Sequence, residues 1–457
     1  MHRVRIIVDE LTFEEILSKT RALMPGVVQD LKCLIRYPSV AFPGYPREPV
    51  LAMADATVAV LREYGLCNAR LIEIPGGYPA VYGEILAPPG MPTVLMYAHY
   101  DVQPAQKEDG WKTDPWEPEE KGGRLTGRGA ADDKSGIMLI AVSLRIFDGK
   151  PPVGVKVLIE GEEETTSHIE ELVATRPDLF SCDAFIIADN GNLSMGEPAL
   201  TTTLRGVVSC IIEVSTLDHA VHSGMFGGAA PDALVALIKI LATLHDARGN
   251  VAVRGLQSDT TGDGDYQIES YRESAGVLDG VDLIGTGPLG DRLWSRPSVT
   301  VIGIDAPSIK AAANILIPRA AAKISMRIAP DADPGHDLEV LMNYLRTAAP
   351  WNARVEIKEV GHSPGFSCPT GGPGYAAARK ALATAFGRQV LEKGTGGSIP
   401  LLRTLHDVVP HAEFVLWGAE DAAGSRIHGT NESVDLGDLE RIIAAQALFL
   451  SLLKKER

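Results

Sequence analysis

Short apolar runs that lead directly into charged or histidine residues constrain the fold of this chain most strongly. The first run, Thr93 to Ala98, is bounded by prolines and glycines and is followed at once by His99. Two further runs of the same kind extend from Val153 to Ile159 and from Ala184 to Ala188. Runs of this length and composition are typical of strands that are covered on both faces of a sheet.

Helical patterns alternate with these runs. Apolar residues recur at helical spacing from Phe13 to Arg36, from Val50 to Tyr64 and from Ser135 to Phe147. Strands that alternate with helices predict an α/β fold in which helices flank a mixed, largely parallel sheet.

The pattern changes near Leu204, and a chain of 457 residues is too long for one ordinary core. Two segments then alternate like half-exposed strands, and helical segments accompany them. We therefore predict an inserted α+β domain over residues 204–365, a lid or dimerisation domain, within a larger domain of residues 1–203 and 366–457. We expect the stretch from Gly255 to Pro297, rich in Gly, Asp and Ser, to be an excursion with little regular core.

Charge and composition exclude several classes of function. The net charge of −16 argues against nucleic acid as the main ligand, because phosphate backbones repel an acidic chain. Five widely spaced cysteines without a CxxC pair argue against a disulfide framework or a thiolate zinc site. We expect no signal peptide, because Met1 to Glu10 lacks a long apolar stretch, and no membrane span. A cytoplasmic location is the prediction that remains.

Histidines and carboxylates gather where the predicted strands end. His99 and Asp101 follow the first strand, Glu162 to Glu164 the second, and Asp189 the third, while Asp132 lies in a glycine-rich loop. Each cluster alone is a weak signal, since such residues are common in turns and on solvated faces. Open α/β sheets bring these ends together, so negative charge would crowd there unless cations neutralised it. Oxygen and imidazole ligands without thiolate favour Zn or Mn, with Co also possible.

The chain resembles the dinuclear-metal dipeptidases that include carnosinase and cytosolic nonspecific dipeptidase. More distant resemblance extends to carboxypeptidase G, aminoacylase and succinyl-diaminopimelate desuccinylase. Seven ordered motifs carry it over nearly the whole chain, and they are Met96 to Pro104, Gly127 to Lys134, Glu160 to Glu164, His222 to Gly228, Asn314 to Pro318, Gly396 to Pro400 and Ile427 to Glu432. The resemblance implies a zinc-exopeptidase-like domain, two divalent metal ions and a peptidase acting on small peptides.

The resemblance also implies roles for individual residues. The implied metal ligands are His99, Asp132, Glu164, Asp189 and His428. Asp132 would bridge both ions, Asp101 would fix the tautomer of His99, and Glu163 would be the general base. Because three glutamates are consecutive, a register shifted by one would instead make Glu162 the base and Glu163 the ligand. Thr166 also departs from the family pattern, which has glycine there.

Residues of the inserted domain complete the implied site. His222 would stabilise the developing oxyanion from a partner subunit, which implies a homodimer. Arg327 would bind the substrate's terminal carboxylate, and Asn314 and Ser398 would line the pocket. Hydrolysis of N-acyl or N-carbamoyl amino acids by the same residues is an alternative. A non-catalytic, ligand-binding paralogue is a remote one, since no implied ligand or base is missing.

Overall fold

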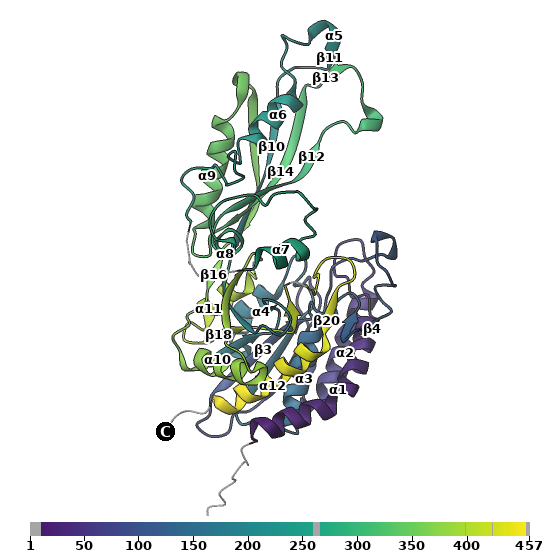
Figure 1. Cartoon of the computed structure of the whole chain (residues 1–457), viewed down its shortest axis with the longest axis vertical. Coiled ribbons are helices and arrows are strands. Elements are labelled where there is room, and N and C mark those ends of the chain that lie inside the picture. Colours follow the sequence, from purple (N-terminus) through teal and green to yellow (C-terminus); the bar gives the residue numbers. More distant parts are fainter. Residues whose placement is uncertain (1–10, 259–265, 398, 423, 454–457) are drawn as a thin grey trace, which may run out of the picture.

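Two β-sheets organise the chain, and the computed structural model describes residues 11–258, 266–397, 399–422 and 424–453. The larger sheet lies in one half of an elongated molecule and the smaller, four-stranded sheet in the other (Figure 1). The predicted α/β class with helices flanking a mixed, largely parallel sheet is confirmed. None of the described helices is long and apolar enough to cross a bilayer.

The larger sheet has a parallel centre. Its strands follow the order β1-β2-β6-β3-β7-β18-β9-β16, with β17 paired to β9. The pairs β6–β3, β3–β7 and β7–β18 are parallel, and antiparallel strands extend the sheet on both sides. The strands are β1 (Arg70–Ile72), β2 (Ala80–Ile85), β3 (Thr93–His99), β6 (Gly154–Glu160), β7 (Ala184–Ile187), β9 (Ala199–Leu204), β16 (Phe366–Ser367), β17 (Leu391–Thr395) and β18 (Glu413–Leu416).

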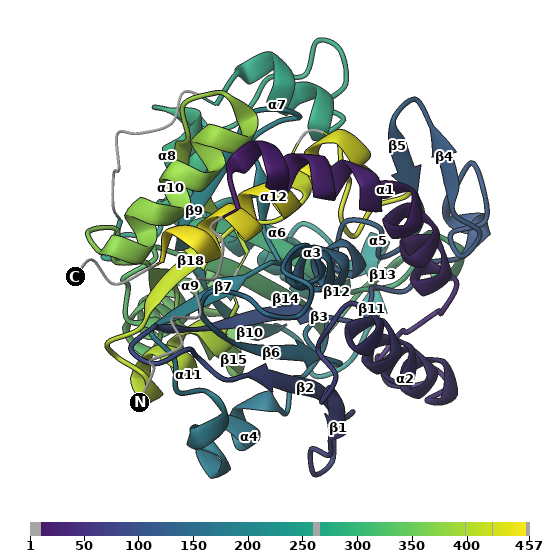
Figure 2. The ribbon, with the colours of Figure 1, turned by 90° about the horizontal axis from the view of Figure 1, so that it is seen from below.

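Helices cover both faces of this sheet, which explains why its central strands are apolar throughout. In β3, Val94 and Met96 enter one core, whereas Leu95 and Tyr97 enter the other. Figure 2 shows α1, α10 and α12 on one side of the strands and α4 on the other. The first core is covered by α1 (Phe13–Ile35), α2 (Glu48–Glu63), α3 (Lys134–Ile146), α10 (Pro373–Phe386) and α12 (Leu436–Leu452), and the second by α4 (Ile169–Thr175) and α11 (Leu401–Val408).

The smaller sheet is antiparallel and follows the order β12-β14-β10-β15. Helices α6 and α9 bury one of its faces, and a short hairpin with α5 extends from its far end (Figure 1). These elements are β10 (Gly206–Ser215), β11 (Val221–His222), α5 (Ser223–Phe226), α6 (Ala233–Ala242), β12 (Ser298–Asp305), β13 (Ile315–Leu316), β14 (Arg319–Ile328), α9 (Pro334–Thr347) and β15 (Arg354–Ser363).

The chain leaves the larger sheet and returns to it at one place. Strand β9 ends at Leu204 and β16 begins at Phe366, and these two residues are paired in antiparallel register. The smaller sheet lies between them in the sequence. The predicted boundaries at 203/204 and 365/366 fall at this junction, and the division into two domains stays a prediction.

The stretch from Gly255 to Pro297 is more regular, within its described residues, than the sequence predicts. It contains α7 (Ile268–Ser274) and α8 (Leu289–Trp294), and a small core forms around Tyr266, Leu289 and Trp294. Helix α8 contacts β17 of the larger sheet. The two short helices were not predicted, because helices this short show too few turns for apolar periodicity to be recognised.

The remaining elements are short and lie mostly in loops. They are η1 (Lys107–Asp109), β4 (Glu119–Lys121), β5 (Arg124–Thr126), η2 (Pro177–Leu179), β8 (Gly191–Asn192), η3 (Ile309–Ala311), η4 (Pro350–Asn352), β19 (Glu420–Asp421) and β20 (Ser433–Asp435). Among them, the pairing of β8 with β19 matters for the site described next.

Candidate metal centre

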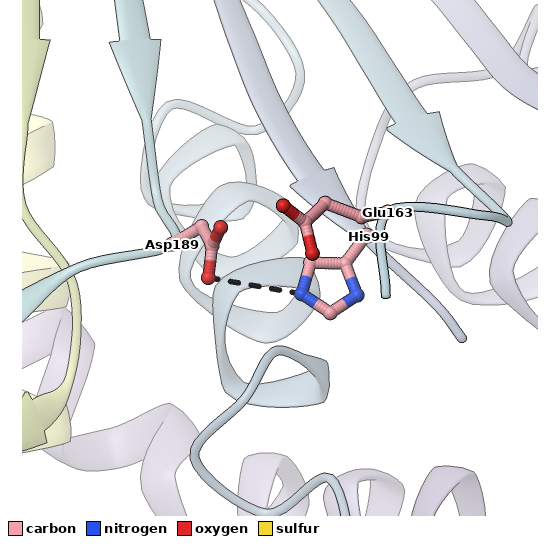
Figure 3. Close-up of side chains that lie close together, drawn as sticks. All are labelled: His99, Glu163 and Asp189. Atoms are coloured by element: carbon pink, nitrogen blue, oxygen red, sulfur yellow. Dashed lines mark ion pairs between the residues drawn. The ribbon is translucent and has the colours of Figure 1, made fainter. Parts of the chain in front are cut away.

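The candidate site lies at the carboxyl ends of β3, β6 and β7. His99 is the last residue of β3, Glu163 follows β6 by three residues, and Asp189 follows β7 by two. Because these three strands are parallel neighbours, their ends reach the same edge of the sheet. Figure 3 shows the three side chains close together, with the Glu163 carboxylate beside the His99 ring and a dashed line joining that ring to Asp189.

Asp132 lies between two histidines and offers one oxygen to each. Its Oδ1 is 2.9 Å from Nε2 of His99, and its Oδ2 is 3.0 Å from Nε2 of His428. The same His99 nitrogen is 3.7 Å from Asp189, and the His428 nitrogen is 3.0 Å from Glu164. A carboxylate flanked in this way has the geometry of a bridging ligand for two ions.

The donor atoms fall into groups that suit divalent cations. Ligand atoms within 4.8 Å of one another belong to His99, Glu163 and Asp189 in one group and to Asp132, Glu164 and His428 in another. A third group joins Asp132 and Asp189 to Glu420. All of these donors are imidazole nitrogens or carboxylate oxygens, which fit Zn or Mn and exclude a thiolate site.

Electrostatics point to the same fit. Burial, followed by the charge of Asp189, raises the pKa of Glu163 well above its ordinary value, and burial raises the pKa of Asp189 to about 6. Burial alone would lower the pKa of His428, but hydrogen bonds to Asp132 and Glu164 raise it to about 11. Without metal, these raised pKa values favour the protonated side chains at this edge of the sheet. Divalent cations would neutralise the same carboxylate charges in place of the protons.

Asp101 organises the loop that carries the glutamates. Its carboxylate accepts hydrogen bonds from the backbone N–H groups of Glu163 and Glu164, both at 3.1 Å. Nδ1 of His99 lies 3.0 Å from the backbone oxygen of Asp101 and 3.4 Å from its carboxylate. With the ring proton on Nδ1, the lone pair of Nε2 faces Asp132 and Asp189. Asp101 thus orients both the histidine and the glutamate pair.

A buried ion pair joins the loops that carry Asp132 and His428. Arg128 Nη1 is 2.7 Å from the carboxylate of Glu432, and both side chains are almost fully buried. Glu432 also accepts from the backbone N–H groups of Gly129, Ala131 and Asp132. Nη2 of Arg128 donates to the backbone oxygens of His428 and Gly429. This network fixes the spacing of the two loops.

The three consecutive glutamates have different surroundings. Glu162 turns away from the ligand groups and lies 3.0 Å from Nδ1 of His168. Glu163 and Glu164 belong to the two histidine-containing groups, and Gln103 donates to Glu164 at 2.6 Å. Since both Glu163 and Glu164 lie in candidate ligand groups, the choice of Glu163 as the base and Glu164 as a ligand stays a prediction.

The predicted substrate residues are not gathered in one place. His222 and Asn314 are exposed at the far end of the smaller sheet, where the backbone of Ser223 donates to the Asn314 carbonyl. Figure 1 shows this end, with β11, α5 and β13, remote from the larger sheet. Arg327 lies on β14, near Arg205. Burial lowers the pKa of Arg205, and the charge of Arg327 lowers it further. Ser398 lies outside the described residues.

Several residues of the site escaped the sequence-based prediction. Gln103, Arg128 and Glu432 lie inside motifs that carry the family resemblance, so their place in those motifs could have indicated a role at the site. Asp133 accepts the backbone N–H of His99 and caps α3. Glu420 lies in no such motif, but it follows the apolar strand β18 by four residues, and β18 is the parallel neighbour of β7. Its position after a strand was therefore a signal that could have indicated its place beside Asp132 and Asp189.

Comparison with known proteins agrees with this geometry. Residues 95–452 match the sequence family described as Peptidase family M20/M25/M40. A cysteinylglycine-S-conjugate dipeptidase of Corynebacterium striatum is 41% identical over 367 residues, which cover 79% of this chain and 80% of that protein. A beta-Ala-His dipeptidase of Rattus norvegicus is 32% identical over 386 residues, covering 78% and 76%. The crystal structure of human carnosine dipeptidase 1 superposes with a TM-score of 0.80 at 26% identity, covering 96% of this chain and 98% of that one.

Proposed function

The chain belongs to peptidase family M20/M25/M40 and is a metal-dependent peptidase, and we propose that it hydrolyses the amide bond of dipeptides with two divalent metal ions. One observation carries the proposal. The Asp132 carboxylate lies between His99 and His428, and the carboxylate of Glu163 lies close to His99 and Asp189. The similarity to dipeptidases from a bacterium and a mammal supports a dipeptide as substrate.

We assign the ligands to two ions that share one carboxylate. His99, Asp132 and Asp189 would hold the first ion, and Asp132, Glu164 and His428 the second. Zn and Mn suit these donors best, and Co is also compatible. Bound ions of this kind acidify a water molecule and polarise the scissile carbonyl.

Glu163 would move the proton during the reaction. Its carboxylate takes a proton from the water as the water oxygen attacks the scissile carbonyl carbon. It then gives this proton to the amide nitrogen as the carbon–nitrogen bond breaks, which yields two amino acids. The raised pKa of Glu163, caused by burial and by Asp189, favours a group that can hold the proton between these steps.

A second subunit would complete the site. His222 is exposed and remote from the metal centre of its own chain, so it would stabilise the oxyanion only in the site of a partner. Asn314 lies on the same tip and would reach the same substrate. We therefore propose a homodimer with a two-fold axis, in which the smaller sheets meet.

The same chain would supply the remaining substrate contacts. Arg327 would bind the terminal carboxylate of the dipeptide through its planar guanidinium, and Ser398 would line the pocket. A cytoplasmic location for the enzyme stays a prediction from the sequence.

Metal removal tests the proposal directly. The purified protein would be stripped with a chelator and assayed on dipeptides and N-acyl amino acids before and after Zn or Mn is added back. We expect dipeptide hydrolysis to disappear on stripping and to return at about two ions per chain. Activity confined to N-acyl or N-carbamoyl amino acids would instead support the alternative substrate class. A folded, metal-loaded protein inert on the whole panel would contradict both.

A further inference from the structure

Glu420 is an acidic residue at the rim of the metal centre to which the mechanism assigns no task. Its carboxylate oxygen is grouped with those of Asp132 and Asp189, within 4.8 Å of one another. The two histidine-containing ligand groups do not include it. Glu420 therefore lies next to the bridging ligand without being needed for either set of three ligands.

The backbone of Glu420 is held firmly in this position. Strand β19 pairs in parallel with β8, so that Glu420 lies opposite Gly191. A Cβ atom at position 191 would lie 2.2 Å from the Glu420 carbonyl oxygen and 2.4 Å from its Cβ, so only glycine permits this approach. The next residue, Asp421, is buried and lies 2.8 Å from Nη2 of Arg124. The short strand is thus anchored on both sides of Glu420.

The side chain of Glu420, by contrast, is not committed to the protein structure. Asp101 accepts two backbone N–H groups and Glu432 accepts three, so these acids support loops. Across the described part of the chain, no hydrogen bond or ion pair within 4.0 Å holds the Glu420 carboxylate, although burial raises the pKa of Glu420 and the charge of Lys393 lowers it. Glu420 as a residue is half-buried, whereas Glu432 is fully buried.

We propose that Glu420 binds the free ammonium group of the substrate's N-terminal residue. In an α-dipeptide that ammonium is one carbon away from the scissile carbonyl carbon, so catalysis brings it to the rim of the metal pair. Two metal cations would repel the ammonium there, and an uncommitted carboxylate is its complementary partner. An N-acyl amino acid has no such charge and would gain nothing from Glu420.

This inference rests on the proposed dipeptidase function and specifies how free peptides are distinguished from acylated amino acids. Selectivity of this kind arises because a site built to bind a charged group loses free energy when the group is missing. A hydrogen bond to a charged group contributes about 10- to 100-fold in affinity. We expect Glu420 to contribute a discrimination of that size.

The test compares alanylglycine with propionylglycine, which differs only by lacking the ammonium group. We expect Glu420→Gln to lower kcat/KM for alanylglycine about 10- to 100-fold and to leave that for propionylglycine within about twofold. Metal content would stay at two ions per chain. Glu356→Gln, on the exposed surface of β15, is the matched control and should leave kcat/KM unchanged for both substrates.

Three results would overturn the assignment. They are a fall in metal content in Glu420→Gln, an equal loss of activity on both substrates, and an unchanged preference for alanylglycine. Because Glu420→Gln could reduce turnover for other reasons, binding is measured separately by calorimetry. Alanylglycine should bind more weakly to the Glu163→Gln/Glu420→Gln protein than to Glu163→Gln alone. Failure of the proposed function is recognisable in the wild-type enzyme, which would then prefer propionylglycine.

Discussion

The metal centre and the tip that carries His222 hold their functional residues in opposite ways. At the metal centre, His99 and Asp132 are buried and each is bonded by several neighbours. At the tip, His222 is exposed, and its Nδ1 accepts only the backbone N–H of Gly224 among the described contacts. One region is therefore assembled within the folded chain, whereas the role proposed for His222 requires a second chain.

The surface of the tip supports this interpretation. Met225 is 77% exposed and Ile309 is 97% exposed, and Ile302 and Ile304 on the edge strand β12 are more than half exposed. Apolar side chains gathered on an unpaired edge strand and its neighbouring loops are typical of a surface that another chain covers. By this comparison, the metal-binding side chains would be positioned by folding of one chain. The residue that stabilises the oxyanion, His222, would be supplied when two chains associate.

The strongest test of the prebuilt region removes the proton-transferring group. We expect Glu163→Gln to lower kcat about 10²- to 10⁴-fold while both ions stay bound, because the ligand oxygens are unchanged. Glu162→Gln is the matched control, since Glu162 faces His168 instead of the ligand groups, and it should retain most activity. Steady-state kinetics and metal analysis on both variants measure this. Near-wild-type turnover in Glu163→Gln would refute the role of Glu163, and the reverse order of effects would restore the other register.

The next test asks whether the tip acts across subunits. We expect His222→Ala to lower kcat about 10²- to 10³-fold, as the loss of one oxyanion donor does. Mixing it with Glu163→Gln chains should restore activity, because a mixed dimer contains one site with both residues. Random 1:1 exchange would return about a quarter of wild-type activity.

His219→Ala is the control for this experiment, because His219 is also exposed near the tip but has no assigned role. It should leave activity unchanged. The absence of complementation in a mixture shown by sedimentation to contain mixed dimers would contradict the partner contribution. A fully active monomer would contradict it as well.

The third prediction concerns the network that holds the metal loops. Arg128→Ala would leave the Glu432 carboxylate buried without its cation, which costs about 3–5 kcal/mol of the free energy of unfolding. The ion between Asp132 and His428 should also bind more weakly, because Arg128 holds the backbone of both His428 and Gly429. Urea unfolding and metal titration measure the two effects.

An exposed ion pair provides the comparison for that network. Arg21 lies 3.0 Å from Glu440, but its side chain is 64% exposed. Arg21→Ala should therefore lower the free energy of unfolding by less than about 1 kcal/mol. Equal losses in the two variants would mean that the Arg128–Glu432 pair does not fix the metal loops.

The fold was readable from the sequence wherever local pattern and burial agree. The apolar run before His99 predicted β3 to within one residue, because a strand covered on both faces must be apolar throughout. Helix α1 was predicted equally well, since its apolar periodicity is a local signal. Helices α7 and α8 were missed because they are short, and α8 in addition contacts β17, which is distant in the sequence.

The site shows the same division. His99, Asp132 and Asp189 could be predicted as metal ligands because each lies at a strand end or in a motif. The parallel strands bring such ends together. Glu420 was missed although it also follows a parallel strand, β18, because it lies four residues beyond the strand end and no recognised motif contains it. The remoteness of His222 from its own metal centre also depends on the position of the smaller sheet, which no local pattern encodes.

The last prediction concerns the pH dependence of stability, which should differ between the metal-free and the metal-loaded protein. The folded pKa of Asp189 is raised from 3.8 to about 6, so its contribution to stability is full below pH 3.8 and is lost as the pH rises through 6. His428, raised from 6.5 to about 11, acts in the same direction above pH 6.5. The metal-free protein should therefore be less stable at pH 8 than at pH 5. Bound ions replace these protons, so the metal-loaded protein should lose much less, and Asp189→Asn should reduce the loss in the metal-free form. Thermal melts at the two pH values measure it, and a metal-free protein more stable at pH 8 than at pH 5 would show that the carboxylates are not crowded as this geometry requires.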